Sequence, residues 1–342
     1  MVIVHKLWRN YIFRRLAKSV LVVFIVTTLT FFLVRLMPGN PLDIYINSLV
    51  VQGIPLADAQ AQAASIYHVD LSKPVLQQYG EYMSGIFLHG DFGMSITAMG
   101  TPVSKLVLKF LPWTLFVVLV SLIISFSLGL LLGMLMAYRR ETWFDHLLSA
   151  FASIMSSVPN YLVGMLILVY LGVRWKIVDT AAIRGSHSPD VPVGFTLRFM
   201  LDALYHATLP ILTYVLTTIG HWMLVMKSST LATMGEDYVT VARARGLRDG
   251  RITLAYVGRN AVLPLFTQLA LSIGSVVGGS ILIETIFTYQ GIGQQLNQAM
   301  VGRDYPVMQG VFIIITASVV TANLLADLLY SRLDPRIRVQ GR

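Results

Sequence analysis

Cysteine is absent from the 342-residue sequence, which excludes disulfide bonds, thiolate metal sites and thiol nucleophiles. Charge is also scarce, because Asp, Glu, Lys and Arg make up 13% of the residues, against about 25% in ordinary soluble domains. Apolar and aromatic side chains account for 55% of the chain instead. A composition this poor in charge indicates an integral membrane protein rather than a soluble domain.

Common catalytic and nucleotide-binding motifs are missing as well. The sequence contains no G-x-x-x-x-G-K-S/T phosphate loop, no H-E-x-x-H zinc motif and no G-x-S-x-G nucleophile turn. The seven His residues are scattered, without the spacing of metal ligands. We therefore expect no catalytic residue, no metal site and no bound cofactor in this chain. An intramembrane protease or a lipid transferase has little support.

Six largely uncharged runs interrupt the polar segments. A helix of roughly 20 apolar residues crosses a bilayer core of about 30 Å. Helices are expected because unpaired backbone amides are costly in hydrocarbon, and the alternation of β-barrel strands is missing. The sequence therefore predicts an all-α polytopic membrane protein with one membrane domain over residues 1–342. The predicted spans are about 16–36, 112–138, 147–173, 207–227, 260–283 and 306–330.

Basic residues are distributed unevenly between the two sides that six spans define. The segments on the side of the termini carry 17 of the 26 Lys and Arg residues, and these segments are 1–18, 139–146, 227–259 and 332–342. The positive-inside bias therefore places both termini and the loop 227–259 in the cytoplasm, and the segment 37–109 outside. The first run lacks a small-x-small cleavage site at its end, so we expect an uncleaved first span.

Polar groups inside the spans are candidates for a transport path. His221 is the ionisable residue of the fourth span, and Gln268 lies in the fifth. Each of them fits either a water-filled path or structural packing between helices. The spans offer no chain of acidic residues at mid-membrane depth, which counts against a proton-coupled transporter.

The loop 227–259 contains a compact charged segment, EDYVTVARARGL, at residues 236–247. Glu236 and Asp237 suit the first turn of a helix, and Arg243 and Arg245 suit the last turn, because each sign complements the helix dipole there. Gly246 is placed to end the helix in the left-handed conformation. We expect one side of this helix to be formed by Tyr238, Val241, Ala242 and Arg245. Physical reasoning alone leaves open whether the helix docks on a partner or lies on lipid headgroups.

The same loop resembles the EAA loop of ABC transporter permeases, most closely in the dipeptide and oligopeptide importer branch. The resemblance rests on YVTVARARGL at 238–247 and GRNAVLP at 258–264. Further matching motifs follow the family order along nearly the whole chain, and these are MPGNP at 37–41, GDFGMS at 90–95, TPV at 101–103, LPWT at 111–114, ETIFTYQGIG at 284–293, RDYPV at 303–307 and LDPRI at 333–337.

The loop also departs from the family pattern. Where the family has Glu-Ala-Ala, this chain has Thr240, Val241 and Ala242, so the acid that gives the loop its name is missing. The distance from Gly246 to Pro264 is longer than in many importers of the family. Both features fit the peptide branch, and they give no support to a salt bridge of the kind found in sugar importers.

The resemblance implies a fold, a mechanism and partners. The fold is the type I ABC importer permease fold, and the loop is a coupling helix that docks on a separate ATPase subunit. ATP and Mg belong to two such ATPase subunits, a second homologous permease completes the pore, and an extracytoplasmic binding protein delivers the substrate, with no nucleic acid involved. The implied coupling residues are Glu236, Asp237, Tyr238, Ala242, Arg243, Ala244, Arg245, Gly246 and Leu247.

Contacts with the binding protein are expected on the external segments 37–109 and 284–305. Glu284, Arg303 and Asp304 are candidate polar contacts there, with pairing among themselves as the alternative. Peptide is the expected cargo. The same machine carrying an oligosaccharide, nickel or an antimicrobial peptide stays open, and an ion-coupled secondary transporter is a more distant alternative.

Overall fold

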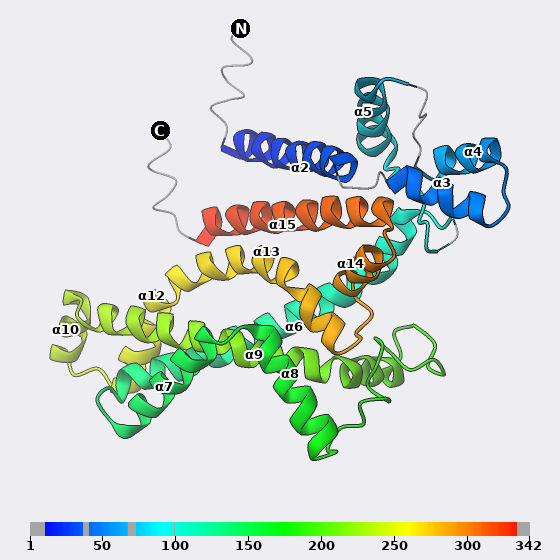
Figure 1. Ribbon diagram of the computed structural model, residues 1–342. Coiled ribbons are helices and arrows are strands. Elements are labelled where there is room, and N and C mark those ends of the chain that lie inside the picture. Colours follow the sequence, from blue (N-terminus) through cyan, green and yellow to red (C-terminus); the bar gives the residue numbers. More distant parts are fainter. Residues whose placement is uncertain (1–10, 37–40, 68–72, 99, 334–342) are drawn as a thin grey trace, which may run out of the picture. The chain divides into compact units, whose positions relative to one another are not determined.

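The computed structural model describes residues 11–36, 41–67, 73–98 and 100–333, and it is helical almost throughout (Figure 1). Within these residues the β-structure amounts to one isolated bridge between Met94 and Pro102. The expected all-α class is therefore confirmed. The chain forms two compact units, Met1–Thr114 with Gln290–Leu324, and Leu115–Tyr289 with Leu325–Arg342.

The first unit combines the N-terminal helices with the beginning of the last one. Its helices are α2 (Tyr11–Leu36), α3 (Pro41–Val51), α4 (Leu56–Tyr67), α5 (Val75–Ser84), the π-helix η1 (Gly85–His89), the start of α6 (Val103–Tyr138), α14 (Ile292–Val301) and most of α15 (Tyr305–Leu333). Phe31 of α2 is fully buried and packs on the rings of Tyr79 and Tyr82 from α5. The side chain of Gln309 on α15 donates to the carbonyl oxygen of Thr30 on α2 at 3.2 Å.

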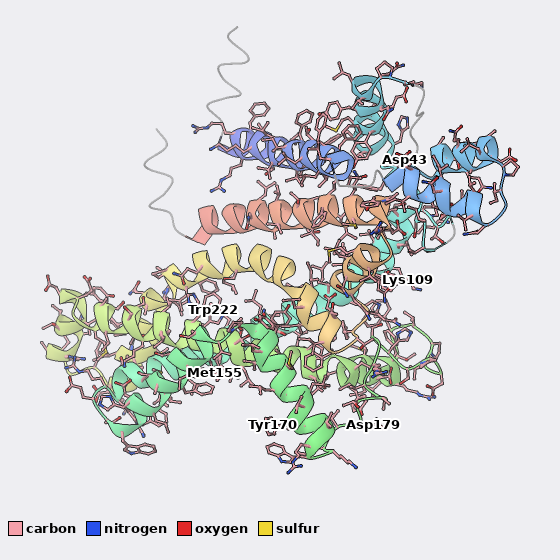
Figure 2. The ribbon with its side chains drawn as sticks, viewed as in Figure 1. Asp43, Lys109, Met155, Tyr170, Asp179 and Trp222 are labelled. Atoms are coloured by element: carbon pink, nitrogen blue, oxygen red, sulfur yellow. The ribbon has the colours of Figure 1, made fainter. Side chains whose placement is uncertain are left out.

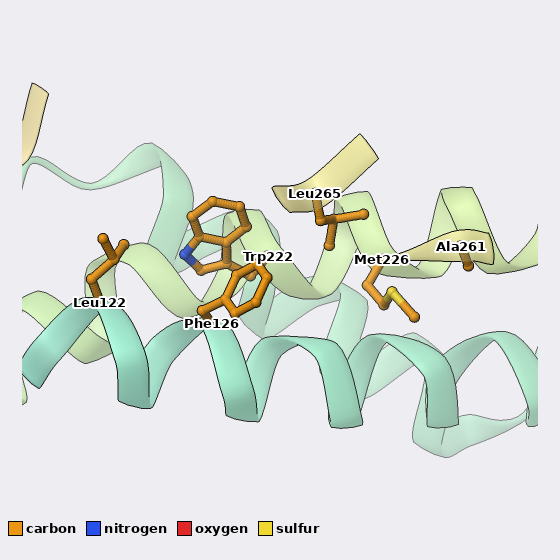
Figure 3. Close-up of a cluster of buried hydrophobic side chains, with 6 residues drawn as sticks. All are labelled: Leu122, Phe126, Trp222, Met226, Ala261 and Leu265. Carbon is orange, nitrogen blue, oxygen red and sulfur yellow. The ribbon is translucent and has the colours of Figure 1, made fainter. Parts of the chain in front are cut away.

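The second unit holds the rest of α6 and the loop 227–259. Its other helices are α7 (Trp143–Ser157), α8 (Asn160–Ile167), η2 (Leu168–Arg174), α9 (Leu197–Met234), α10 (Asp237–Ala244), α11 (Asp249–Arg251), η3 (Ile252–Gly258), α12 (Arg259–Ala261) and α13 (Leu263–Ile286). A buried apolar cluster joins α6, α9 and α13 (Figure 3). At its centre the rings of Phe126 and Trp222 meet edge to face, with centroids 5.1 Å apart.

Close packing of α6 on α9 depends on two glycines. A Cβ added at Gly129 would lie 2.3 Å from Cβ of Trp222, and one at Gly133 would lie 2.5 Å from the carbonyl oxygen of Met223. The small-xxx-small pattern of Gly129 and Gly133 therefore marks a real helix contact.

Four helices of the described residues are long and apolar enough to cross a membrane, namely Phe13–Val34, Val103–Tyr138, Leu197–Met234 and Tyr305–Leu324. They lie where four of the six predicted spans were placed. A fifth crossing is reached only if Trp143–Ser157 and Asn160–Arg174, bent by 103° against each other, count as one span. The helix α13 overlaps the remaining predicted span, 260–283, but it is not one of these candidate crossings. The count of six spans therefore stays a prediction.

The sharp bend falls at Pro159, inside the predicted span 147–173. Proline lacks an N–H donor and disfavours the helical conformation of the residue before it. Val158 accordingly adopts an extended conformation, with φ −83° and ψ 127°, and Pro159 precedes the first residue of α8. Beyond the bend lies Tyr170 on η2 (Figure 2). The centroid of its ring is 5.6 Å from that of Trp175. The third predicted span, 147–173, thus consists of two helices bent by 103° against each other, with Pro159 at the break.

Candidate coupling segment

The segment at residues 236–247 forms the helix α10, as its sequence predicts. Glu236 takes the position before the helix in an extended conformation, and Asp237 begins the helix with a negative charge in its first turn. The inner face of α10 is made by Val239 and Ala242, which pack with Ile252 and Val257 in a buried apolar cluster. This cluster fixes α10 to η3, the π-helix that follows it in the loop.

Gly246 ends α10 in the way expected from the sequence. Its φ is +71°, in the left-handed region that glycine adopts without strain. The N–H of Gly246 donates to the carbonyl oxygen of Arg243 at 2.9 Å, and the N–H of Leu247 donates to that of Ala242 at 3.3 Å. These two bonds form a Schellman motif, and Leu247 packs against the apolar cluster below.

The outer face of α10 differs from the prediction in one respect. Tyr238 and Val241 are 39% and 55% exposed, and Arg243, Ala244 and Arg245 are exposed as well. Ala242 is only 2% exposed, although we expected it beside Val241 on one side. Consecutive helical residues point about 100° apart, and here the boundary between inside and outside falls between these two. Ala242 therefore anchors α10 to its own chain.

Hydrogen bonds tie the segment to the following helices. The side-chain amide of Asn260 on α12 donates to the hydroxyl of Tyr238 at 3.1 Å and to the carbonyl oxygen of Tyr256 at 2.8 Å. The hydroxyl of Ser229 on α9 donates to the carbonyl oxygen of Ala261 at 2.6 Å. The segment 236–247 is thus bonded to α12, which is itself bonded to α9 and leads into α13.

The two candidates for a transport path lie in different surroundings. His221 is exposed on α9, and its ring lies edge-on to that of Trp222 with centroids 5.2 Å apart. Gln268 is half-buried on α13, and its side-chain oxygen is buried without a hydrogen-bond partner among the described residues. An unpaired buried amide oxygen is costly. A role of either residue in transport stays a prediction.

The three candidates for binding-protein contacts also differ in exposure. Arg303 is exposed and adopts a left-handed φ of 53°. Glu284 and Asp304 are 1% and 0% exposed, inside their own units. Burial raises the pKa of the Tyr289 phenol above its ordinary value, and the charge of Glu284 adds to this effect. Contact with a partner stays a prediction for all three, and Arg303 has the accessible side chain.

Asp304 has a structural role that the sequence did not indicate. One carboxylate oxygen accepts from the hydroxyl of Ser95 at 2.5 Å, and from the N–H and hydroxyl of Thr97 at 3.0 and 2.8 Å. The other oxygen accepts from the N–H of Val307 at 3.3 Å, in the first turn of α15. Asp304 thereby joins the turn after the GDFGMS motif to the start of α15.

Two polar clusters were also missed by sequence reasoning. Asp145 on α7 pairs with Lys227 on α9, at 2.5 Å between Oδ1 and Nζ. Ser188 donates to Asp202 at 2.7 Å and lies 3.2 Å from Nε2 of His206. Because Asp202 also faces Nε2, at 3.8 Å, this cluster lacks the Asp-on-Nδ1 geometry of a hydrolytic triad. For the first cluster, the sequence signal was that Asp145 and Lys227 each stand at the end of an apolar run.

Comparison with known proteins agrees with this architecture. The family described as "Binding-protein-dependent transport system inner membrane component" matches residues 129–339, and its N-terminal companion family matches residues 8–115. The transmembrane chain of a solved structure, described as inward-facing conformations of the MetNI methionine ABC transporter, aligns with a TM-score of 0.55. The alignment covers 70% of this chain and all of that one at 17% identity, which supports a shared fold.

Relatives that align over nearly the whole chain are named as permease proteins of peptide transport systems. The dipeptide transport system permease protein DppB of Escherichia coli K12 is 32% identical, over 96% of this chain and 98% of the relative. The oligopeptide transport system permease protein AppB of Bacillus subtilis is 31% identical over the same shares. The di/tripeptide transport system permease protein DppB of Pseudomonas aeruginosa is 32% identical over 97% and 99%.

These matches define a class of protein, the membrane-embedded permease subunits of ABC importers. The chain belongs to the family of binding-protein-dependent transport system inner membrane components. Its place is therefore the inner membrane. Its relatives are named as permease proteins, and the family implies separate ATPase and substrate-binding partners.

Proposed function

We propose that the chain is one of two homologous membrane subunits that form the pore of an ATP-driven importer of dipeptides or oligopeptides. The observation that carries this proposal is the full-length similarity, above 30%, to permeases named for dipeptide, oligopeptide and di/tripeptide transport. Similarity over nearly the whole chain includes the spans as well as the loop, so it concerns the pore itself.

The remaining components follow from the same proposal. A second permease completes the pore, two ATPase subunits bind ATP and Mg on the cytoplasmic side, and an extracytoplasmic binding protein delivers the peptide. The external helices α3 and α4 form a small packed body of their own, with Ile46, Ala59 and Ala63 buried between them. Together with the exposed Arg303, this body offers a surface for the binding protein.

The helix α10 docks on the ATPase subunit in this proposal. Its inner face is occupied by the chain itself, so docking uses the outer face with Tyr238, Val241, Arg243 and Arg245. The Schellman motif at Gly246 holds this face in place. The apolar cluster with η3 and the bond to Asn260 pass the motion of α10 to the following helices.

Reconstitution tests the proposed function. The chain is co-expressed with its candidate permease, ATPase and binding-protein partners and placed in liposomes. Uptake of radiolabelled alanyl-alanine and of a labelled pentapeptide is then measured with and without ATP. We expect ATP-dependent uptake that unlabelled peptides compete away. Uptake driven by an ion gradient in the absence of ATPase subunits would contradict the proposal, and competition by nickel or an oligosaccharide alone would change the cargo.

Val241→Asp is expected to weaken docking of the ATPase subunit. Val241 is a half-exposed apolar residue on the outer face of α10, so the charge leaves the fold unchanged but must be desolvated at the interface. Co-purification of the ATPase subunit and peptide uptake should both fall several-fold. Leu254→Asp is the matched control, because Leu254 is 69% exposed in the same loop but outside α10. Equal loss in both variants would contradict docking through α10.

A further inference from the structure

A charge pair joins α7 to the cytoplasmic end of α9. The helix α9 has 38 residues, a length of about 57 Å, so it extends well beyond a bilayer core of about 30 Å. Lys227 follows an uncharged run that begins after Asp202 and lies ten residues before α10 starts at Asp237. Lys227 therefore marks where α9 leaves the hydrocarbon and continues toward the coupling segment.

The partner of Lys227 is nearly inaccessible. Asp145 is 4% exposed, and its Oδ1 lies 2.5 Å from Nζ of Lys227. The hydroxyl of Ser149 donates to the same oxygen at 3.2 Å and also accepts from Lys227 at 3.0 Å. The N–H of Glu141 donates to Oδ2 at 3.2 Å. The carboxylate is thus held from three directions, by α9, by α7 and by the turn before α7.

The helices α7 and α9 lie side by side (Figure 1), and the contact around the charge pair is apolar. Ala152 on α7 is fully buried against Met223 and Ile219 on α9. A Cβ added at Gly220 would lie 2.4 Å from the carbonyl oxygen of Ala152. The hydrophobic attraction in this contact is itself non-directional, and Gly220 sets how closely the two helices approach. The ion pair, with its hydrogen bonds, has a single favourable geometry.

We propose that Asp145 and Lys227 are positioning residues that fix the register of α7 on α9, so that displacement of α10 is transmitted to α7. This inference rests on the proposed function, because the displacement comes from a docked ATPase subunit. A movement of α10 passes along α9, whose last residue Met234 packs in the cluster beneath α10. At Lys227 the movement reaches Asp145, and α7 moves with α9 instead of slipping past it.

The energetics of buried ion pairs distinguish a role in fixing the register of α7 on α9 from a role in stabilising the fold. Removing one partner leaves an uncompensated buried charge and is strongly destabilising, whereas replacing both partners by apolar residues is often neutral or stabilising. The best-attested use of such pairs is to select one register. The apolar replacement Asp145→Leu with Lys227→Met should therefore keep the assembly intact and lose only the transmission.

The test uses the full importer in liposomes and two readouts. The first is tryptic cleavage at Arg139 and Arg140, two exposed residues in the turn before α7, with and without ATP and vanadate. The second is the number of alanyl-alanine molecules imported per ATP hydrolysed. The variants are the apolar pair, the charge swap Asp145→Lys with Lys227→Asp, and Lys227→Arg. The control is Asp190→Leu with Arg198→Met, which removes an exposed ion pair of 3.2 Å in the same unit.

In the wild type and in the control, ATP is expected to change cleavage at Arg139 and Arg140. In the apolar pair this change is lost and import per ATP falls several-fold, while ATPase co-purification stays normal. The charge swap restores part of the ATP-dependent change in cleavage and part of the import per ATP. Normal ATP-dependent cleavage and import in the apolar pair would overturn the inference, and so would a wild type whose cleavage does not respond to ATP.

If neither double variant assembles, Lys227→Arg decides, because arginine keeps the charge but reaches farther. Reduced import per ATP then supports the inference, and an unchanged ratio contradicts it. The proposed function fails in a different way. Absence of ATP-dependent peptide uptake in the wild type contradicts the cargo, while the cleavage at Arg139 and Arg140 still reports the register.

Discussion

The Gly133→Leu variant is expected to assemble poorly, because α6 and α9 touch backbone to backbone at this point. A Cβ at position 133 would lie 2.5 Å from the carbonyl oxygen of Met223, 2.7 Å from Cβ of Met226 and 3.1 Å from the backbone nitrogen of Lys227. Backbone atoms cannot move aside as the end of a flexible side chain can. Overpacking of this kind costs about 1–3 kcal/mol, and occasionally more. The clash lies beside Lys227, so we expect peptide uptake per assembled importer to fall as well.

The melting temperature of the detergent-solubilised subunit, followed by tryptophan fluorescence, measures the effect. Gly80→Leu is the matched control, because Gly80 lies in the interior of α5 and a Cβ there meets nothing within 4 Å. Leucine is a better helix former than glycine by roughly 0.5–1 kcal/mol. The same substitution should therefore lower the melting temperature at position 133 and leave it unchanged or raised at position 80. Equal effects at both positions would contradict a close α6–α9 contact.

Much of the local structure was predictable from neighbouring residues. The apolar runs gave the long helices, and the order of acid, arginine and glycine gave α10 with its left-handed end at Gly246. The small-xxx-small spacing of Gly129 and Gly133 is typical of a close helix contact, and the structure has one there. These features depend on residues a few positions apart, and local sequence specifies such features well.

Features that depend on distant residues were not predictable. Asp145 and Lys227 are 82 residues apart in sequence, and Asp304 is more than 200 residues from Ser95. A single sequence does not indicate which distant donors meet a carboxylate. The inner face of α10 was misjudged for the same reason, since Ala242 turns inward to meet Ile252 and Val257. The helical period gives the angle between residues but leaves open which side the protein covers.

Asp304→Ala is expected to be the most damaging change in the first compact unit. The fully buried carboxylate accepts from Ser95, from both donors of Thr97 and from the N–H of Val307. Alanine leaves these donors without their acceptor, and each unsatisfied buried group costs about 1–3 kcal/mol. The loss also removes a cap from the start of α15, which is worth about 1 kcal/mol. The total destabilisation should reach about 3–5 kcal/mol, less where water enters.

Asp304→Asn separates the hydrogen bonds from the bulk of the side chain. Its amide oxygen can replace the carboxylate oxygen that accepts from Ser95 and Thr97, but its NH₂ group cannot accept from the N–H of Val307. The melting temperature should therefore fall in the order wild type, Asn, Ala. Asp58→Ala is the control in the same unit, because Asp58 is exposed in the first turn of α4 and its charge is worth only about 0.3–1 kcal/mol there. If Asp304→Ala melted like Asp58→Ala, the carboxylate would not be the link between α15 and the turn at Ser95.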